Sequence, residues 1–153
     1  MSMAEKTADW PTALADYLTR EAPKPFSWSS HNCMHFTMGA VFAMTGMKGV
    51  ANLPECRSAL QASAILAMHK GLAEYLDKLL SNFGCEEIPA SQATRGDLCI
   101  IKTDRGPCAG VVGVGEVFCL GAEHMTAAPK SSITEAWRIP EMNFKNSWAL
   151  SFP

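Results

Sequence analysis

The sequence predicts an α+β fold in which helices pack on one side of a small antiparallel β-sheet. Apolar residues recur at helical spacing through the first half of the chain, whereas short β-branched runs separated by glycine and proline fill the second half. Helices followed by strands are typical of α+β domains, which gather their helices on one face of the sheet. The 153 residues suit one domain, which we assign to residues 1–140, followed by a C-terminal tail at 141–153.

Four helices are predicted in the first half. The first three begin at a polar capping residue or a proline, the fourth follows Gly71, and all four end near a glycine or a proline. Their ranges are about Pro11 to Glu21, Cys33 to Met44, Pro54 to Lys70, and Leu72 to the residues before Gly84. The second helix is apolar on nearly every face, so we expect it to be central and buried.

Four strands are predicted in the second half, and an aromatic tail follows them. The strands cover about Asp97 to Lys102, Ala109 to Val114, Glu116 to Leu120 and Ala136 to Ile139. The tail carries Phe144, Trp148 and Phe152, and aromatic side chains are enriched in interfaces. We expect the tail to contact another subunit; the alternative is that it folds back over its own domain.

Composition and charge exclude several classes of protein. A net charge of −2 gives no field that would attract a polyanion, so we expect no nucleic-acid partner. No apolar run reaches the roughly 20 residues that span a bilayer, and the N-terminus has no signal-peptide pattern, so we expect synthesis in the cytoplasm and no membrane insertion. The six cysteines form no C-x-x-C pair, and Gly113-Val114-Gly115 lacks the strand-to-helix setting of a dinucleotide loop. We expect neither a metal nor a cofactor.

Two sets of cysteines are candidates for chemistry. Cys33 would occupy the first turn of the buried helix, where free N–H groups and the helix dipole stabilise a thiolate, so it suits a nucleophile. The alternative is a small buried hydrophobic residue. Cys99, Cys108 and Cys119 lie on successive predicted strands, and adjacent strands could bring their thiols together, although core packing explains them as well.

Three segments follow one another in the order of a known pattern. They are Pro25-Phe26-Ser27-Trp28 leading to Asn32-Cys33 and Phe36, then Thr94-Arg95-Gly96-Asp97-Leu98-Cys99-Ile100-Ile101, and finally Cys108-Ala109-Gly110-Val111-Val112-Gly113. This order resembles the NlpC/P60 cysteine peptidases, whose aromatic-Trp segment leads into Asp-Cys-Ser at the start of a central helix. Their later strands carry Pro-Gly-Asp-Leu and His-Val-Gly-Ile-Tyr-Leu. The resemblance implies a papain-like half-fold with Cys33 at the position of the nucleophile.

A narrower resemblance covers almost the whole chain. Its motifs are Phe26-Ser27-Trp28-Ser29-Ser30-His31-Asn32-Cys33, Met44-Thr45-Gly46, Arg95-Gly96-Asp97 and Ala136-Trp137-Arg138-Ile139. Together they resemble a family of unknown function, distantly NlpC/P60-like, that is encoded among phage and prophage tail genes. This resemblance implies a virion protein whose partners are other tail-tip and baseplate proteins, with peptidoglycan as a further partner if the site is active.

The chain departs from the peptidase pattern at the catalytic positions. A cysteine peptidase needs an imidazole beside the thiol and a polar group that orients the imidazole. Cys108 stands at the histidine position, and the orienting residue falls near Cys119 or Leu120. His31 could fold back toward Cys33 as an unorthodox base, or it could hydrogen-bond the connector backbone.

Two functions remain open at the level of the sequence. The first, which we favour, is a structural component of a phage tail tip or baseplate that keeps an NlpC/P60-like scaffold after losing catalysis, because the imidazole and its orienting group are missing. The second is an active tail peptidase or amidase that cleaves peptidoglycan peptides, with Cys33 as nucleophile and His31 as base. Loss of base activation typically costs orders of magnitude in rate.

Overall fold

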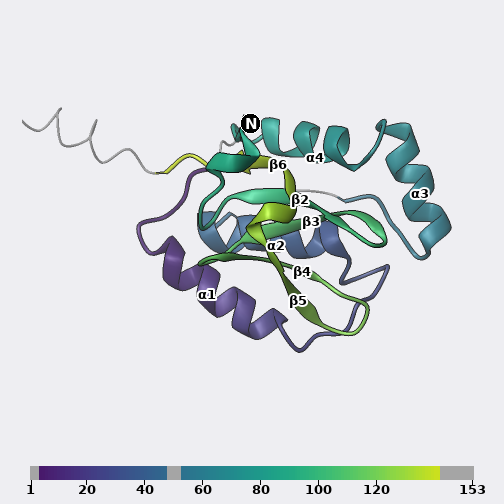
Figure 1. Ribbon diagram of the computed structural model, residues 1–153, viewed down its shortest axis with the longest axis horizontal. Helices are drawn as coiled ribbons and strands as arrows, with labels where there is room; N and C mark the ends of the chain where they lie inside the picture. Colours follow the sequence, from purple (N-terminus) through teal and green to yellow (C-terminus); the bar gives the residue numbers. More distant parts are fainter. Residues whose placement is uncertain (1–3, 48–52, 142–153) are drawn as a thin grey trace, which may run out of the picture.

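The computed structural model describes residues 4–47 and 53–141, and it confirms an α+β fold with helices first and strands second (Figure 1). The helices are α1 (Trp10–Glu21), α2 (Cys33–Thr45), α3 (Ala59–Met68) and α4 (Leu72–Ser81). The strands are β1 (Glu86–Ile88), β2 (Leu98–Thr103), β3 (Gly106–Val112), β4 (Glu116–Leu120), β5 (Met125–Pro129) and β6 (Ile133–Arg138). The tail predicted at 141–153 lies, apart from its first residue, outside the described residues.

The strands form one six-stranded sheet in the order β1-β6-β2-β3-β4-β5, and each neighbouring pair is antiparallel. The sheet is therefore larger than the sequence predicts, since β1 and β5 were not expected. Both are short strands at the edges of the sheet and contain residues with weak β-propensity. The last predicted strand begins three residues earlier than expected, at Ile133 rather than Ala136.

Local capping fixes the ends of the central helix. The side-chain oxygen of Asn32 accepts hydrogen bonds from the backbone N–H groups of Met34 and His35, each at 3.0 Å. At the other end, Gly46 adopts a left-handed conformation with φ of 71° and closes the last turn. The range of α2 thus agrees closely with the prediction.

The third helix is shorter than predicted. Residues 54–57 are not helical, because Ser58 caps the helix by accepting a hydrogen bond from the N–H of Gln61 at 3.2 Å. None of the residues of α3 is fully buried, and both Leu60 and Met68 are 80% exposed. In Figure 1 this helix lies at the right-hand edge of the molecule.

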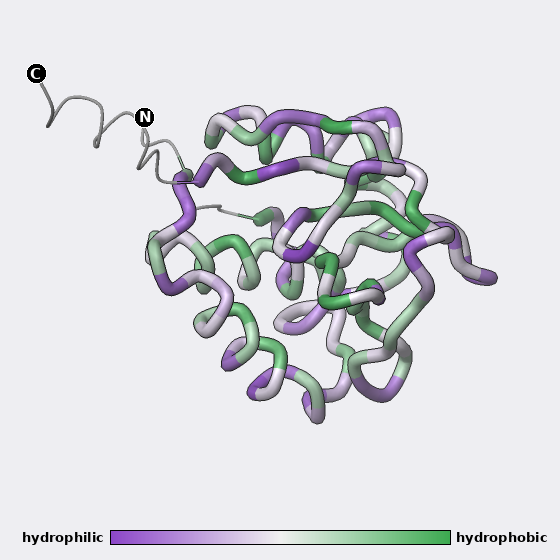
Figure 2. The backbone as a smooth tube through the Cα atoms, turned by 60° about the vertical axis from the view of Figure 1, so that its left-hand side comes forward, coloured by the Kyte–Doolittle hydropathy of each residue, from purple (hydrophilic) through white to green (hydrophobic). Residues whose placement is uncertain are grey.

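The main core lies between the helices and one face of the sheet. It combines buried residues of α1, α2 and α4 with alternate residues of β2 and β3, and in Figure 1 α2 passes behind the central strands. Its largest fully buried members are Trp137, Phe36, Leu14, Met38 and Met44. Figure 2 shows that hydrophobic segments follow the strands and α2, whereas hydrophilic residues dominate the turns.

A second, smaller core lies on the other face of the sheet. Its members include Cys99 and Ile101, which share a face as strand alternation predicts, together with Val112, Val117 and Cys119. Among the residues that the structure describes, none of the helices combines the length and hydropathy needed to cross a bilayer.

Candidate functional site

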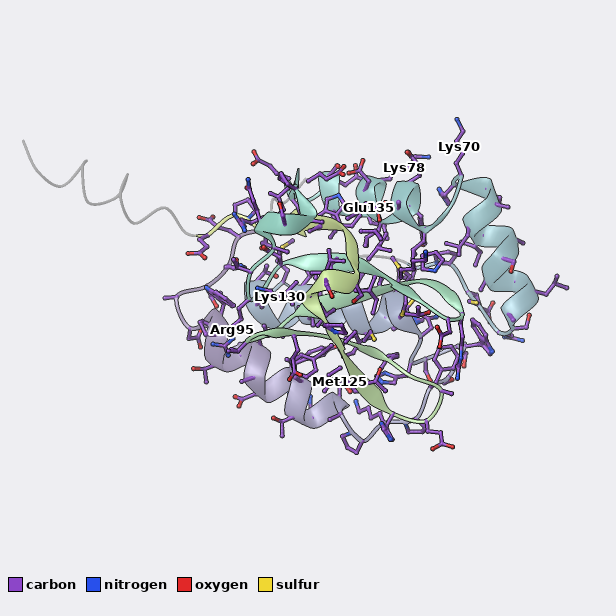
Figure 3. All side chains as sticks on the ribbon, viewed as in Figure 1. Lys70, Lys78, Arg95, Met125, Lys130 and Glu135 are labelled. Atoms are coloured by element: carbon purple, nitrogen blue, oxygen red, sulfur yellow. The ribbon has the colours of Figure 1, made fainter. Side chains whose placement is uncertain are left out.

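A cavity of about 760 Å³ opens beside the first turn of α2. Its walls come from the connector before α2, from α3, from the start of α4, from the β2–β3 hairpin and from the β4–β5 turn. Figure 3 labels Met125, the first residue of β5, just after that turn. Aromatic side chains of Phe26, Trp28 and Tyr75 contribute to the lining. Four cysteines also line the cavity, namely Cys33, Cys56, Cys108 and Cys119. Concave sites with apolar walls and few reactive groups are where ligands usually bind.

Cys33 is the first residue of α2 and is partly buried. The cap provided by Asn32 starts the helix at this residue, so the thiol lies beside the positive end of the helix dipole. The sequence therefore placed Cys33 correctly at the start of a buried helix.

Cys33 contacts the first half of β3. Strands β3 and β4 pair only from Gly110 to Val112 and from Val117 to Cys119. The first half of β3, which contains Cys108 and Ala109, is therefore not paired with β4. Cys33 hydrogen-bonds here with the Cys108 thiol and the N–H of Ala109.

The environment of Cys33 favours its thiolate. Hydrogen bonding with the Cys108 thiol lowers the pKa of Cys33 to about 7, and the N–H groups of Ala109 and Cys33 act in the same direction. Burial opposes them by disfavouring the charged form. A group with this pKa is substantially ionised at neutral pH.

Cys108 is the middle member of a row of three thiols. Hydrogen bonds to Cys119 and Cys33, followed by burial, raise the pKa of Cys108, so this residue keeps its proton. The same contact with Cys108, helped by the Thr126 hydroxyl at 3.5 Å, lowers the pKa of Cys119 to about 6 against the effect of burial. The Cys108 thiol also donates to the carbonyl oxygen of Ala109, 3.5 Å from its sulfur. Because Cys108 has one S–H proton, it can donate to only one of these neighbours at a time. Since Cys33 also has two backbone N–H donors and a helix N-terminus, we assign the thiolate to Cys33.

His31 does not line the cavity that holds Cys33. Its ring packs edge-on against Phe36 with centroids 6.5 Å apart, and the charges that act on it are those of Glu21 and Lys24. The Nε2 atom of His31 is buried without a hydrogen-bond partner among the described residues. The groups that set the Cys33 pKa include no histidine in the part of the chain that the structure describes.

The remaining histidines do not line the cavity either. Burial, followed by the charge of His31, lowers the pKa of His35. His69 stacks on Tyr75 with centroids 4.5 Å apart, and His124 lies exposed in the β4–β5 turn with Nδ1 2.9 Å from the carbonyl oxygen of Met125.

Cys99 does not join the row of thiols that lines the cavity. It is fully buried in the second core, and burial raises its pKa to about 12. Within residues 4–47 and 53–141, no group of three or more histidine, cysteine or acidic side chains is arranged to hold a metal ion. From the sequence, the thiols of Cys99, Cys108 and Cys119 could lie together. In the structure, Cys108 and Cys119 lie with Cys33 instead.

Sequence reasoning missed the contact between Cys33 and Cys108, although both residues were singled out. It also missed Cys56 and Thr126 as parts of the cavity. The position of Cys108 opposite the nucleophile in the peptidase pattern was the available signal. The place where the β3–β4 ladder ends left no local signal in the sequence.

Comparison with known proteins places the chain in one family. A family model described as a domain of unknown function, DUF6950, matches residues 5–139. The match covers most of the chain, which therefore belongs to this family. No curated protein matches the chain.

Proposed function

We propose that this protein is a structural component of a bacteriophage tail tip or baseplate, built on an NlpC/P60-like scaffold whose catalytic site has degenerated. The main support for the loss of catalysis is the contact between Cys33 and Cys108. A thiol lies beside Cys33, at the place where the NlpC/P60 peptidases that the sequence resembles carry an imidazole. The scaffold assignment is further supported by helices gathered on one face of an antiparallel sheet, with Cys33 at the start of the central helix.

Amide hydrolysis needs a proton-accepting base beside Cys33, and Cys108 does not provide one. The base must accept a proton and later return it to the leaving amine near neutral pH. The raised pKa of Cys108 keeps this residue protonated, so it is a hydrogen-bond donor and not a base. Cys119, the next group in the row, is also a thiol and cannot orient an imidazole.

The proposed virion role rests on the resemblance of the sequence motifs to a family encoded among phage tail genes. In the fold these motifs have structural roles. Phe26 and Trp28 pack edge-on with centroids 4.8 Å apart, and Gly46 caps α2. Asp97 is bound by Arg138 through two hydrogen bonds. Such roles suit a scaffold that is retained without catalysis, and the implied partners are other tail-tip and baseplate proteins.

The virion role is tested on phage particles. Tails purified from an induced lysogen that encodes the chain are analysed by mass spectrometry, with a non-structural phage protein as the reference for contamination. We expect the chain at a fixed ratio to the known tail proteins. Its presence only in the soluble lysate fraction would overturn the proposal.

One observation favours a second candidate, an active cysteine peptidase or amidase that acts on peptidoglycan peptides. Cys33 carries a lowered pKa and lines a cavity of about 760 Å³. A muropeptide-release assay with the wild-type protein and the Cys33→Ala variant separates the two functions. Cys56→Ala is the matched control, since Cys56 lines the same cavity. Release by wild type and by Cys56→Ala, but not by Cys33→Ala, would establish the hydrolase.

A further inference from the structure

We propose that Cys33 and Cys108 form an oxidisable thiol pair, which a hydroperoxide converts to a reversible disulfide. The two thiols are in contact, come from elements far apart in the sequence, and line the same cavity. The pair needs neither peptidase activity nor a tail partner. Its chemistry is therefore independent of the proposed function.

The cavity gives a small oxidant a path to Cys33. A volume of about 760 Å³ is far larger than a peroxide molecule, whose size is close to that of water, about 30 Å³. Oxidation-sensitive cysteines combine thiolate character, access and a neighbouring thiol that resolves the first product. The hydrogen-bond donors around Cys33 give it thiolate character, and the cavity gives it access to the oxidant. Cys108 is the neighbouring thiol that resolves the first product.

The reaction balances with a hydroperoxide as oxidant. The Cys33 thiolate attacks one peroxide oxygen, the O–O bond breaks, and the products are the Cys33 sulfenic acid and hydroxide. The Cys108 sulfur then attacks the Cys33 sulfur, forming the S–S bond. The sulfenic hydroxyl leaves as water after taking up the Cys108 proton. Two thiols lose two electrons and two protons in total, and the peroxide is reduced.

Cys108 is a better partner for Cys33 than the other thiols at the cavity. The Cys33 thiolate is stabilised by two backbone N–H groups, those of Ala109 and Cys33, in addition to the Cys108 thiol. Beside Cys108, the Cys119 thiol has only the Thr126 hydroxyl. Cys33 is therefore the better group to attack the oxidant, and Cys108 is the thiol next to it. The Cys56 thiol instead donates to the carbonyl of Ser58 at 3.6 Å.

The test is mild hydrogen peroxide treatment of the reduced protein, followed by alkylation of free thiols and non-reducing peptide mapping. We expect a peptide pair joined through Cys33 and Cys108, the loss of two hydrogen atoms in the intact mass, and recovery of both thiols with dithiothreitol. Dimedone, which reacts with sulfenic acid, should label Cys33 only weakly in the wild type because Cys108 resolves the acid quickly.

Three variants make the test specific. Cys33→Ser should lose the disulfide, and Cys108→Ser should lose it while accumulating the dimedone adduct at Cys33. Cys56→Ser is the matched control and should form the disulfide as the wild type does. Oxidation of wild-type Cys33 to sulfinic acid without a disulfide, or a first disulfide that omits either Cys33 or Cys108, would overturn the proposal. Before oxidation, a circular dichroism spectrum checks that each variant is folded.

Discussion

Arg138 binds both carboxylate oxygens of Asp97, with Nε 3.1 Å from Oδ1 and an Nη atom 2.9 Å from Oδ2. Asp97 is fully buried just before β2, whereas the Arg138 side chain at the end of β6 is 40% exposed. The backbone N–H of Thr94 also donates to Asp97 at 2.8 Å. This bidentate ion pair satisfies the buried carboxylate and links the start of β2 to the end of β6.

Replacing Arg138 with methionine should destabilise the fold. The change leaves the buried Asp97 carboxylate without its main cation, although the Thr94 N–H remains. Breaking a buried pair costs about 3–5 kcal/mol, and the exposure of Arg138 reduces our expectation to about 2 kcal/mol. Urea denaturation followed by tryptophan fluorescence measures the free energy of unfolding.

The matched control for this prediction is Arg105→Met. Arg105 is an exposed arginine in the β2–β3 turn, so its replacement should change the free energy of unfolding by less than about 0.5 kcal/mol. Arg138→Lys should recover part of the loss, because lysine keeps the charge but not the planar pair of donors. Equal stabilities of Arg138→Met and Arg105→Met would contradict the role assigned to the ion pair.

The contrast between α2 and β5 shows what could be predicted from the sequence. The ends of α2 follow from Asn32 and Gly46, which act within one turn of the helix. Residues of β5 have little intrinsic preference for a strand, and the strand is defined by its pairing with β4, for example between Thr126 and Cys119. Local signals were therefore sufficient for the central helix and insufficient for an edge strand.

At the candidate site, too, one feature could be predicted from local sequence and another could not. Cys33 was recognisable because its position in a helix depends on its neighbours in the chain. The contact between Cys33 and Cys108 joins the start of α2 to a part of β3 that lies beyond the last β3–β4 pair, at Gly110. Such an arrangement is a tertiary property, and residue spacing does not specify it.

Gly39 of α2 is a position where a larger side chain should destabilise the protein. A Cβ added there would overlap the Tyr17 hydroxyl and lie 2.8 Å from the Tyr17 Cζ atom. The Tyr17 hydroxyl is held in place by donating to the carbonyl of Phe36 at 2.7 Å. Overpacking costs about 1–3 kcal/mol, whereas alanine gains about 1 kcal/mol in helix propensity over glycine. We therefore expect Gly39→Ala to lower the Tm by a few degrees in differential scanning calorimetry.

A double-mutant cycle isolates the contact between Gly39 and Tyr17. In a Tyr17→Leu background the ring is absent, so adding Gly39→Ala should cost less than it does in the wild type. If Gly39→Ala raises the Tm of the wild-type protein, helix propensity outweighs the overlap and the prediction is wrong.

The stability of the protein should fall in mildly acidic solution. Burial lowers the pKa of His31 below its usual value of 6.5, with Glu21 opposing the effect and Lys24 adding to it. Burial likewise lowers the pKa of His35. Between the lowered folded value and 6.5 the unfolded chain binds more protons, so the free energy of unfolding decreases as the pH falls through this window. Urea denaturation from about pH 7 to about pH 5 measures the decrease.

The variant His31→Gln should flatten part of this profile, because glutamine does not titrate. His124→Gln is the control, since His124 lies exposed in the β4–β5 turn, and its profile should match the wild type. A His31→Gln protein that loses stability with acid as steeply as the wild type would show that His31 does not contribute to the acid sensitivity.

Cys33 should react with iodoacetamide before Cys99 or Cys108 near neutral pH. Its pKa is lowered to about 7 by the Cys108 thiol, whereas burial raises the pKa of Cys99 to about 12. Because alkylation requires the thiolate, the labelling rate of Cys33 should rise with pH and reach half its maximum near that pKa. Timed alkylation and peptide mass spectrometry measure the rate at each cysteine.

Variants at Cys108 test the cause of this reactivity. Cys108→Ala removes the S–H donor, so the midpoint of the Cys33 labelling profile should move to higher pH. Cys108→Ser keeps a hydrogen-bond donor at the same place and should retain a lower midpoint than Cys108→Ala. Cys56→Ala removes a thiol from the same cavity, and its midpoint should equal that of the wild type. A midpoint that is the same in Cys108→Ala as in the wild type would assign the reactivity of Cys33 to the helix N-terminus and the backbone donors alone.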